Sequence, residues 1–129
     1  MFVKKIILSF ILIFNVSILG KSLDPIELLS EFVGVDTINP PGNESRAVDF
    51  YAKIFEEEGI EYFTGESAPG RGNIWARIKG GDKPALILLQ HTDVVPASKD
   101  YWETDPMVAE IKDGYLYGRG VIDLSLIHI

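Results

Sequence analysis

The first apolar pattern after residue 20 predicts a helix. Asp24 suits the capping position, Pro25 suits the first turn, and a glutamate follows three residues after the cap. A turn at residues 39–42, which read Asn-Pro-Pro-Gly, separates this helix from the next element. Apolar side chains recur at helical spacing after the cap, at Ile26, Leu29, Phe32 and Val33.

A second helix is expected from about residue 44 to about residue 58. Its apolar side chains fall on one face, and Gly59 is a natural C-terminal cap. The apolar stripe consists of Ala47, Val48, Tyr51, Ile54 and Phe55.

From residue 60 the hydrophobic period shortens, which predicts strands. Residues 60–64 form a short strand, and residues 73–79 alternate apolar with polar side chains, as a half-exposed strand does. Residues 85–90 are nearly all apolar, which predicts a buried central strand.

Further strands are expected beyond residue 100. Residues 108–112 and 115–117 flank Asp113-Gly114, a dipeptide typical of a hairpin turn. Val121 and Ile122 begin another buried strand. Because helices are followed by buried strands, the pattern predicts an α/β domain built in layers.

Residues 1–20 have the pattern of an export signal. Lys4 and Lys5 precede an apolar segment of about 14 residues, shorter than the ~20 that a membrane-spanning helix needs. The small-residue cleavage site at residues 17–20 is imperfect because Ile18 is large. An N-terminal membrane anchor and a buried helix are the alternatives. We expect an exported protein, either periplasmic or secreted.

Composition excludes several classes of function. The 129 residues leave room for about one domain. A net charge of −7 argues against a nucleic-acid partner, which requires a basic surface. The absence of cysteine excludes disulfides, a thiol nucleophile and a thiolate zinc site. Ser45 and Ser98 have no partner histidine at a recognisable motif, so a serine hydrolase is not indicated.

His91, Asp93 and Asp123 are the candidate site residues. His91 directly follows the apolar run, so its imidazole is expected at the rim of the sheet, where α/β folds bind ligands. Neutral imidazole is a good zinc donor, and Asp93 is placed to bind its second nitrogen. Asp123 also follows apolar residues, and a carboxylate there can bind one metal ion or bridge two. The alternative is a solvated histidine beside a solvated aspartate in a loop.

The glycines near Asp123 have a different role. Gly118-Arg119-Gly120 lacks the ending of a phosphate loop, so its glycines are expected to allow a tight backbone approach. Arg119 is expected either to pair with a carboxylate or to lie in solvent.

Three motifs, in order, carry a family resemblance. They are LILLQHTDVVP at residues 86–96, WETDPM at residues 102–107 and DGYLYGRGVID at residues 113–123. Together they resemble the aminoacylase / glutamate carboxypeptidase / carboxypeptidase S family of di-zinc metallopeptidases. Met107 stands where that family usually has Phe, and Ser125 stands where a Lys commonly follows the bridging aspartate.

The resemblance implies a layered α/β/α zinc-peptidase-type catalytic domain, truncated here after its first strands and helices. His91 would bind one zinc ion, Asp123 would bridge two, and Asp93 would serve catalysis by orienting His91. Two Zn²⁺ per site are expected, which Co²⁺ or Mn²⁺ can replace in similar sites. The implied substrate is a peptide or an N-acyl amino acid, and the full-length protein is expected to be a homodimer.

We therefore expect three segments: a signal peptide (1–20), the N-terminal part of a zinc hydrolase domain (21–123) and a non-native tail (124–129). The tail does not resemble the family and does resemble a translated sequencing adapter, so His128 is not expected to be a ligand. A genuine short C-terminus is the alternative.

The function expected from the sequence is zinc-dependent hydrolysis of amide bonds by the full-length protein. The fragment itself is expected to be inactive, because the family's catalytic Glu pair and distal ligands are absent from it. One alternative is a non-catalytic exported metal-binding or vestigial domain, and another is a helper fragment that associates with a separate polypeptide.

Overall fold

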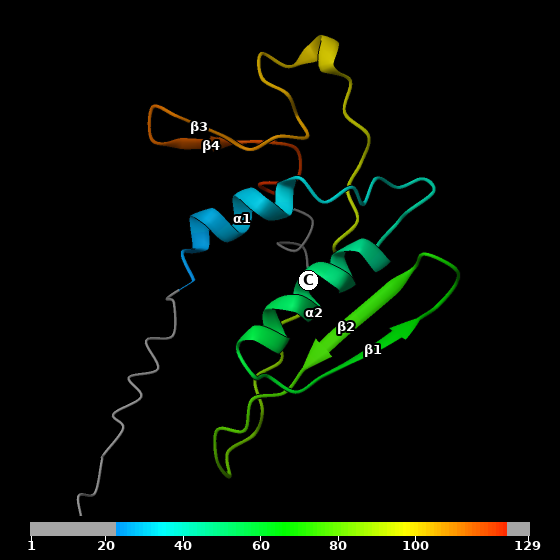
Figure 1. The fold of residues 1–129 in the computed structure, drawn as a ribbon, viewed down its shortest axis with the longest axis vertical. Coiled ribbons are helices and arrows are strands. Elements are labelled where there is room, and N and C mark those ends of the chain that lie inside the picture. Colours follow the sequence, from blue (N-terminus) through cyan, green and yellow to red (C-terminus); the bar gives the residue numbers. More distant parts are fainter. Residues whose placement is uncertain (1–22, 124–129) are drawn as a thin grey trace, which may run out of the picture.

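The structure, a computed structural model, describes residues 23–123 (Figure 1). The first predicted helix is confirmed as α1 (Pro25–Val33). Asp24 Oδ1 accepts hydrogen bonds from the backbone N–H groups of Ile26 at 2.8 Å and Glu27 at 3.3 Å. The side chain thus satisfies amide donors that have no partner within the first helical turn.

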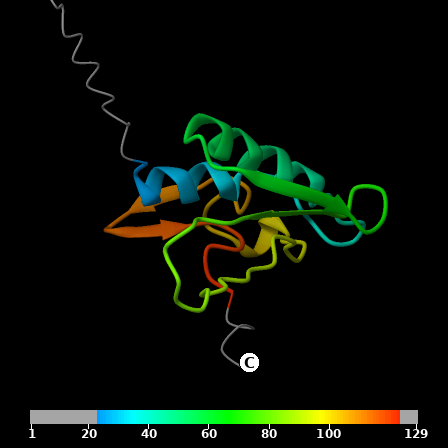
Figure 2. The ribbon, with the colours of Figure 1, turned by 90° about the horizontal axis from the view of Figure 1, so that it is seen from below.

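The second predicted helix is confirmed as α2 (Ser45–Glu57), and Gly59 follows it with a φ of 65°. The chain then forms an antiparallel hairpin of β1 (Tyr62–Glu66) and β2 (Gly72–Ala76). β1 begins two residues later than expected and β2 ends three residues earlier. The hairpin packs against α2, and Figure 2 shows α1 and α2 side by side at one face.

The buried core of the described chain is small. Val33 and Ala47 are buried, at 5% and 1% exposure, and Pro106 is buried in the loop before β3. Neighbouring aromatic rings join α1, α2 and β1, with ring centroids 5.0–6.5 Å apart. Stacked and tilted rings of this kind bury large apolar areas, so they hold the two helices on the hairpin. The rings belong to Phe32, Phe50, Tyr51, Phe55 and Tyr62.

The predicted second hairpin is confirmed as β3 (Glu110–Lys112) and β4 (Tyr115–Tyr117). Asp113 and Gly114 have φ angles of 53° and 81°. Positive φ at both turn residues is what a two-residue hairpin loop of type I′ requires. A short 3₁₀-helix, η1 (Lys99–Tyr101), precedes this hairpin.

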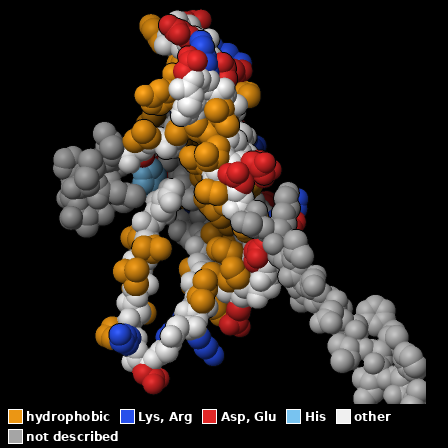
Figure 3. Space-filling view, turned by 90° about the vertical axis from the view of Figure 1, so that its left-hand side faces the viewer, with side chains coloured by type: hydrophobic (Ala, Val, Ile, Leu, Met, Phe, Trp, Pro, Cys, Tyr) orange, Lys and Arg blue, Asp and Glu red, His pale blue; other side chains and the backbone are white. Residues whose placement is uncertain are grey.

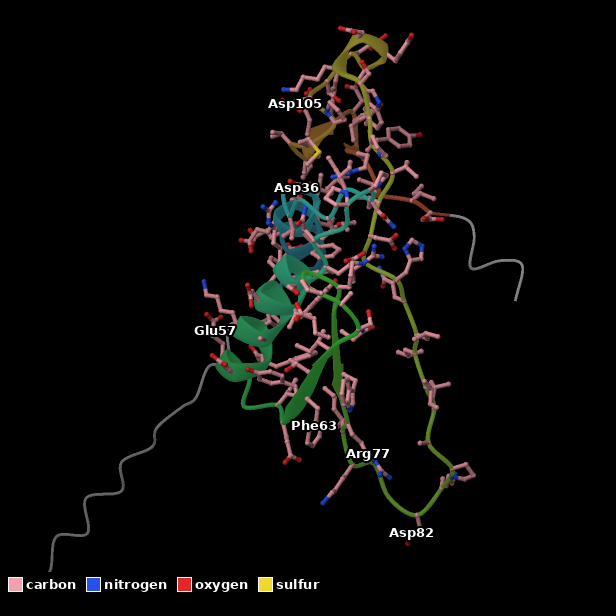
Figure 4. The ribbon with its side chains drawn as sticks, turned by 90° about the vertical axis from the view of Figure 1, so that its right-hand side faces the viewer. Asp36, Glu57, Phe63, Arg77, Asp82 and Asp105 are labelled. Carbon is pink, nitrogen blue, oxygen red and sulfur yellow. The ribbon has the colours of Figure 1, made fainter. Side chains whose placement is uncertain are left out.

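The prediction of a buried central strand at residues 85–90 is wrong. Among residues 23–123 no segment pairs with it, and its four aliphatic side chains are 80–87% exposed. An apolar strand is buried only where other elements cover its faces, and no described element does so here. Figure 4 shows the chain leaving β2 past Arg77 and turning at Asp82. It then runs back over residues 83–90, which we call the extended arm. The exposed side chains are Leu86, Ile87, Leu88 and Leu89.

The strand predicted at Val121 and Ile122 is likewise not found, and Ile122 is 78% exposed. The mixed α/β class is confirmed, but the described strands form two separate antiparallel pairs. The layered α/β/α arrangement stays a prediction. No helix within residues 23–123 is long and apolar enough to cross a bilayer. The predicted signal and tail lie outside the described residues.

Candidate metal centre

His91 lies at the end of the extended arm, with each ring nitrogen beside an aspartate. Its Nδ1 lies 3.1 Å from Asp93 Oδ1, and its Nε2 lies 3.1 Å from Asp123 Oδ2. The imidazole is 41% exposed and is therefore accessible to a ligand. The fold thus brings together the three residues that the sequence singled out, from two segments of the chain.

Asp93 is held in turn by an amide. Asn39 Nδ2 donates a hydrogen bond to Asp93 Oδ2 at 2.8 Å. This hydrogen bond, together with the nearby His91, lowers the pKa of Asp93, although partial desolvation acts in the opposite direction. When the ring proton is on Nδ1, an ionised Asp93 accepts it and Nε2 keeps a lone pair. That is the tautomer that a metal ion requires at Nε2.

The segment around Asp93 is fixed by backbone contacts to the turn after α1. Thr37 Oγ1 donates to the backbone oxygen of Thr92 at 2.6 Å, and Thr37 is 2% exposed. The Val94 amide donates to Thr37 O at 3.2 Å, and the Asn39 amide donates to Val94 O at 2.9 Å. These bonds form a parallel bridge between the two segments. The turn therefore determines where Asp93 sits.

Two glycines bring Asp123 back to this bridge. A Cβ atom on Gly118 would lie 2.7 Å from Val33 Cγ1, and one on Gly120 would lie 2.8 Å from Val94 Cγ1. Real Cβ atoms do not approach other atoms this closely, and Gly120 also has a φ of 78°. The predicted close backbone approach is confirmed.

Arg119 takes neither of the two environments expected for it. It is 4% exposed, its Nη1 donates to Val95 O at 3.2 Å, and its Nη2 donates to Met107 Sδ at 3.0 Å. None of the ion pairs among residues 23–123 includes it. Burial lowers the pKa of Arg119, while the charge of Asp36 acts in the opposite direction. The guanidinium is a buried cross-link between the chain after Asp93 and Met107.

A pocket of about 260 Å³ opens beside His91. It lies between the start of α2, the start of β2 and residues 89–93. Figure 3 shows the hollow that separates the extended arm from the body of the molecule. His91 and Asp93 line this pocket, so a ligand within it would lie next to the candidate centre.

The donor atoms suit zinc but supply only part of a site. An imidazole nitrogen and a carboxylate oxygen are both ordinary zinc ligands, and His91 Nε2 and Asp123 Oδ2 already face each other. Within the described ranges no group of three or more His, Cys, Asp or Glu side chains is arranged to hold a metal ion. A zinc site usually takes three or four protein ligands, so these two donors would need others.

Comparison with known proteins gives one consistent result. The chain is 35% identical over 107 residues to a succinyl-diaminopimelate desuccinylase of Parvibaculum lavamentivorans, which covers 79% of this chain and 26% of the relative. It is 34% identical over 108 residues to the protein of that name from Ehrlichia canis, covering 81% and 28%. A shorter match of 54 residues to the Bordetella petrii protein reaches 49% identity, covering 41% of this chain and 14% of the relative.

These relatives are hydrolase enzymes, named for removing a succinyl group from succinyl-diaminopimelate. The chain spans about a quarter of the length of the curated relatives it matches. No family model matches the chain. The similarity supports a hydrolase of the broad amidohydrolase class, and does not single out the aminoacylases or the carboxypeptidases.

Proposed function

We propose that this chain contributes part of the metal centre of a zinc-dependent amide hydrolase. His91 and Asp123 would hold the metal, and Asp93 would act as the positioning residue for His91. The observation that carries the proposal is the approach of His91 Nε2 to Asp123 Oδ2 at 3.1 Å, while Asp93 occupies Nδ1. When bound, zinc would supply Lewis-acid polarisation of the amide carbonyl and activation of water.

The described residues have a defined task in such a reaction. Asn39 donates to Asp93, and Asp93, as an acceptor beside Nδ1, would orient the ring of His91 and favour a proton on Nδ1. Nε2 is thereby ready to bind a cation without a change of tautomer. The remaining ligands and the general base would come from parts of the protein other than residues 23–123. We therefore propose that the 129-residue chain alone binds a metal ion but does not turn over substrate.

The proposed substrates are peptides or N-acyl amino acids, with a succinyl amide as the best-supported example. The support is the name shared by the relatives, which denotes cleavage of a succinyl group from an amino acid derivative. Two alternatives use the same chemistry. One is cleavage of other acyl groups, as in aminoacylases, and the other is cleavage of peptides, as in carboxypeptidases.

The test is a Co²⁺ titration of the full 129-residue chain, followed by visible absorption and by displacement with Zn²⁺. We expect a bound Co²⁺ spectrum that is lost in His91→Ala and Asp123→Asn. Asp82→Asn, at the exposed tip of the extended arm, is the matched control and should bind as the parent does. Equal affinities in His91→Ala and Asp82→Asn would contradict the proposal.

Activity is a separate measurement. The chain is incubated with Zn²⁺ and an N-succinyl amino acid, and release of the free amine is followed. No turnover is expected from the chain alone. Turnover that is abolished both by a chelator and by His91→Ala would show that the chain needs no further ligands, contrary to the proposal.

A further inference from the structure

The buried guanidinium of Arg119 is bonded to a weak acceptor. Arg119 is 4% exposed, and its Nη2 donates to Met107 Sδ at 3.0 Å. A thioether sulfur is a weak acceptor, and Arg119 Nε has no hydrogen-bond partner within residues 23–123. A buried charged donor without a strong acceptor is costly, because water no longer solvates it. Arg119 would therefore gain from a better acceptor at the position of the Met107 sulfur.

Backbone hydrogen bonds hold Met107 beside Arg119. The Arg119 amide donates to Pro106 O at 2.7 Å, and the Met107 amide donates to Asp105 Oδ1 at 3.0 Å. Pro106 and Arg119 are buried, whereas Met107 is partly exposed, so its side chain lies between the guanidinium and the solvent. The backbone is thus fixed, while the three rotatable bonds of the methionine side chain let its end turn.

Oxidation would convert this sulfur into a strong acceptor. A sulfur lone pair attacks one oxygen of a hydroperoxide, so that an S–O bond forms and the O–O bond breaks. With H₂O₂, the proton on the transferred oxygen passes to the leaving hydroxide, which departs as water. The sulfur loses two electrons and the peroxide gains them, and the product is methionine sulfoxide. Because the sulfoxide oxygen carries partial negative charge, a guanidinium binds it more strongly than a thioether sulfur.

We propose that Met107 is an oxidation site for a hydroperoxide, and that Arg119 holds the sulfoxide oxygen. The oxidant would react at the lone pair that faces away from Arg119, and rotation about the Cγ–Sδ bond would bring the new oxygen to Nη2. Oxidation of a methionine usually disrupts the apolar surroundings of its side chain. The opposite sign is expected at Met107, because the sulfoxide supplies the acceptor that Arg119 lacks. This inference does not depend on the metal centre.

The first test treats the folded 129-residue chain with H₂O₂ and locates the added oxygen by mass spectrometry. The tryptic peptide of residues 100–112 contains one methionine, Met107, and fragmentation distinguishes an oxygen on Met107 from one on Trp102. Urea unfolding of the oxidised chain should show a folding equilibrium constant about threefold to tenfold higher than before treatment. A Met107 that stays reduced in the folded chain, or an equilibrium constant that does not rise, would overturn the inference.

Met107→Leu is the matched control for this treatment. Leucine has a similar volume and cannot form a sulfoxide, while the variant still contains Met1 and Trp102 as oxidisable side chains. Its folding equilibrium constant should not rise when H₂O₂ is added. A rise as large as that of the parent would place the effect elsewhere in the chain and overturn the inference.

A second variant tests the acceptor without an oxidant. Met107→Gln carries an amide oxygen at about the reach of the sulfoxide oxygen, so its folding equilibrium constant should exceed that of Met107→Leu about threefold to tenfold. In the parent, ¹⁵N NMR signals of the Arg119 guanidinium should shift when Met107 is oxidised, a readout that needs no variant. Equal stability of the two variants, or unchanged Arg119 signals, would contradict a sulfoxide held by Arg119.

Discussion

Asn39 controls the residue that orients His91. Its amide donates to Asp93 Oδ2 at 2.8 Å, and its backbone is tied to Val94 on the same segment. Asp93 therefore cannot rotate away from His91 without losing a hydrogen bond. A ligand whose second nitrogen is held in this way presents Nε2 in one orientation.

Replacing Asn39 with Ala should weaken metal binding without removing a ligand. Loss of such a supporting hydrogen bond costs about 10- to 100-fold in metal affinity. The measurement is the Co²⁺ dissociation constant. Asn43→Ala is the control, because the Asn43 side chain donates to no carboxylate among residues 23–123. Equal affinities of the two variants would refute the role given to Asn39.

The same substitution should have a stability effect that depends on pH. Because Asn39 lowers the pKa of Asp93 in the folded state, ionisation of Asp93 favours folding. That contribution is complete above the ordinary carboxyl pKa and is lost as the pH falls through the lowered value. Urea unfolding of the parent and of Asn39→Ala should therefore differ more at pH 7 than at pH 2. A larger difference at pH 2 would give the opposite sign and contradict the assignment.

The sequence indicated some of these residues and not others, for a physical reason. His91 and Asp123 each follow an apolar run, and that local pattern predicted their place at a site. Asn39 acts on a residue 54 positions away, and such a contact leaves no periodic signal in the sequence. The residue was therefore interpreted only as part of a turn. Glu44 was likewise placed in a helix, while its ion pair with Arg71 of the β1–β2 hairpin joins positions far apart in the sequence.

At the scale of elements, the turn before Asp123 is constrained both in its dihedral angle and in its contacts. Gly120 combines a φ of 78° with a missing Cβ that would lie 2.8 Å from Val94 Cγ1. Gly114, in the β3–β4 turn, has a similar φ of 81° but nothing within 4 Å. Comparing Gly114 with Gly120 therefore separates the free-energy cost of a side chain at positive φ from the cost of its contact with Val94.

Alanine substitutions at these glycines should differ in a defined way. Gly114→Ala should cost about 1–2 kcal/mol, the strain of a left-handed L-residue. Gly120→Ala should cost about 1–3 kcal/mol more, because Val94 must move to admit the methyl group. Chemical denaturation measures both. Equal losses in the free energy of unfolding would show that Val94 moves without cost. The Co²⁺ affinity of Gly120→Ala should fall only if Val94 positions Asp93.

Elements were predicted well where their signals are local. The Asp24 cap and the Asp113-Gly114 turn satisfy their own backbone, so both structures followed from the sequence. The strand predicted at residues 85–90 did not form, because an apolar run is buried only when other elements cover it. The apolar composition of residues 85–90 shows that these side chains favour burial. Whether they are buried depends on other elements that pack against them.

At the scale of the whole molecule, the extended arm dominates the surface. Its leucines and isoleucine are at least 80% exposed, and its backbone is unpaired within residues 23–123. An apolar segment with free N–H and C=O groups is a template for pairing with another strand. The small core of Val33, Ala47 and the aromatic cluster offers little to offset this tendency.

We expect the chain to self-associate through this arm. Leu88→Lys should reduce association, because a charge opposes strand pairing and removes an apolar contact. Size-exclusion chromatography with light scattering measures the effect over a range of concentrations. Tyr101→Lys replaces an equally exposed side chain, at 88% exposure, outside the arm. An equal effect of the two variants would mean that association does not use the arm.

The long-range bonds from Asn39 to Asp93 and from Thr37 to Thr92 set the order of events during synthesis. They join positions 54 and 55 residues apart, and closing such a loop costs entropy that only the folded intervening elements offset. Asp123 must also leave the ribosome before it can meet His91. The candidate centre therefore cannot form before residue 123 has left the ribosome, and metal capture would follow the folding of the elements between residues 39 and 123.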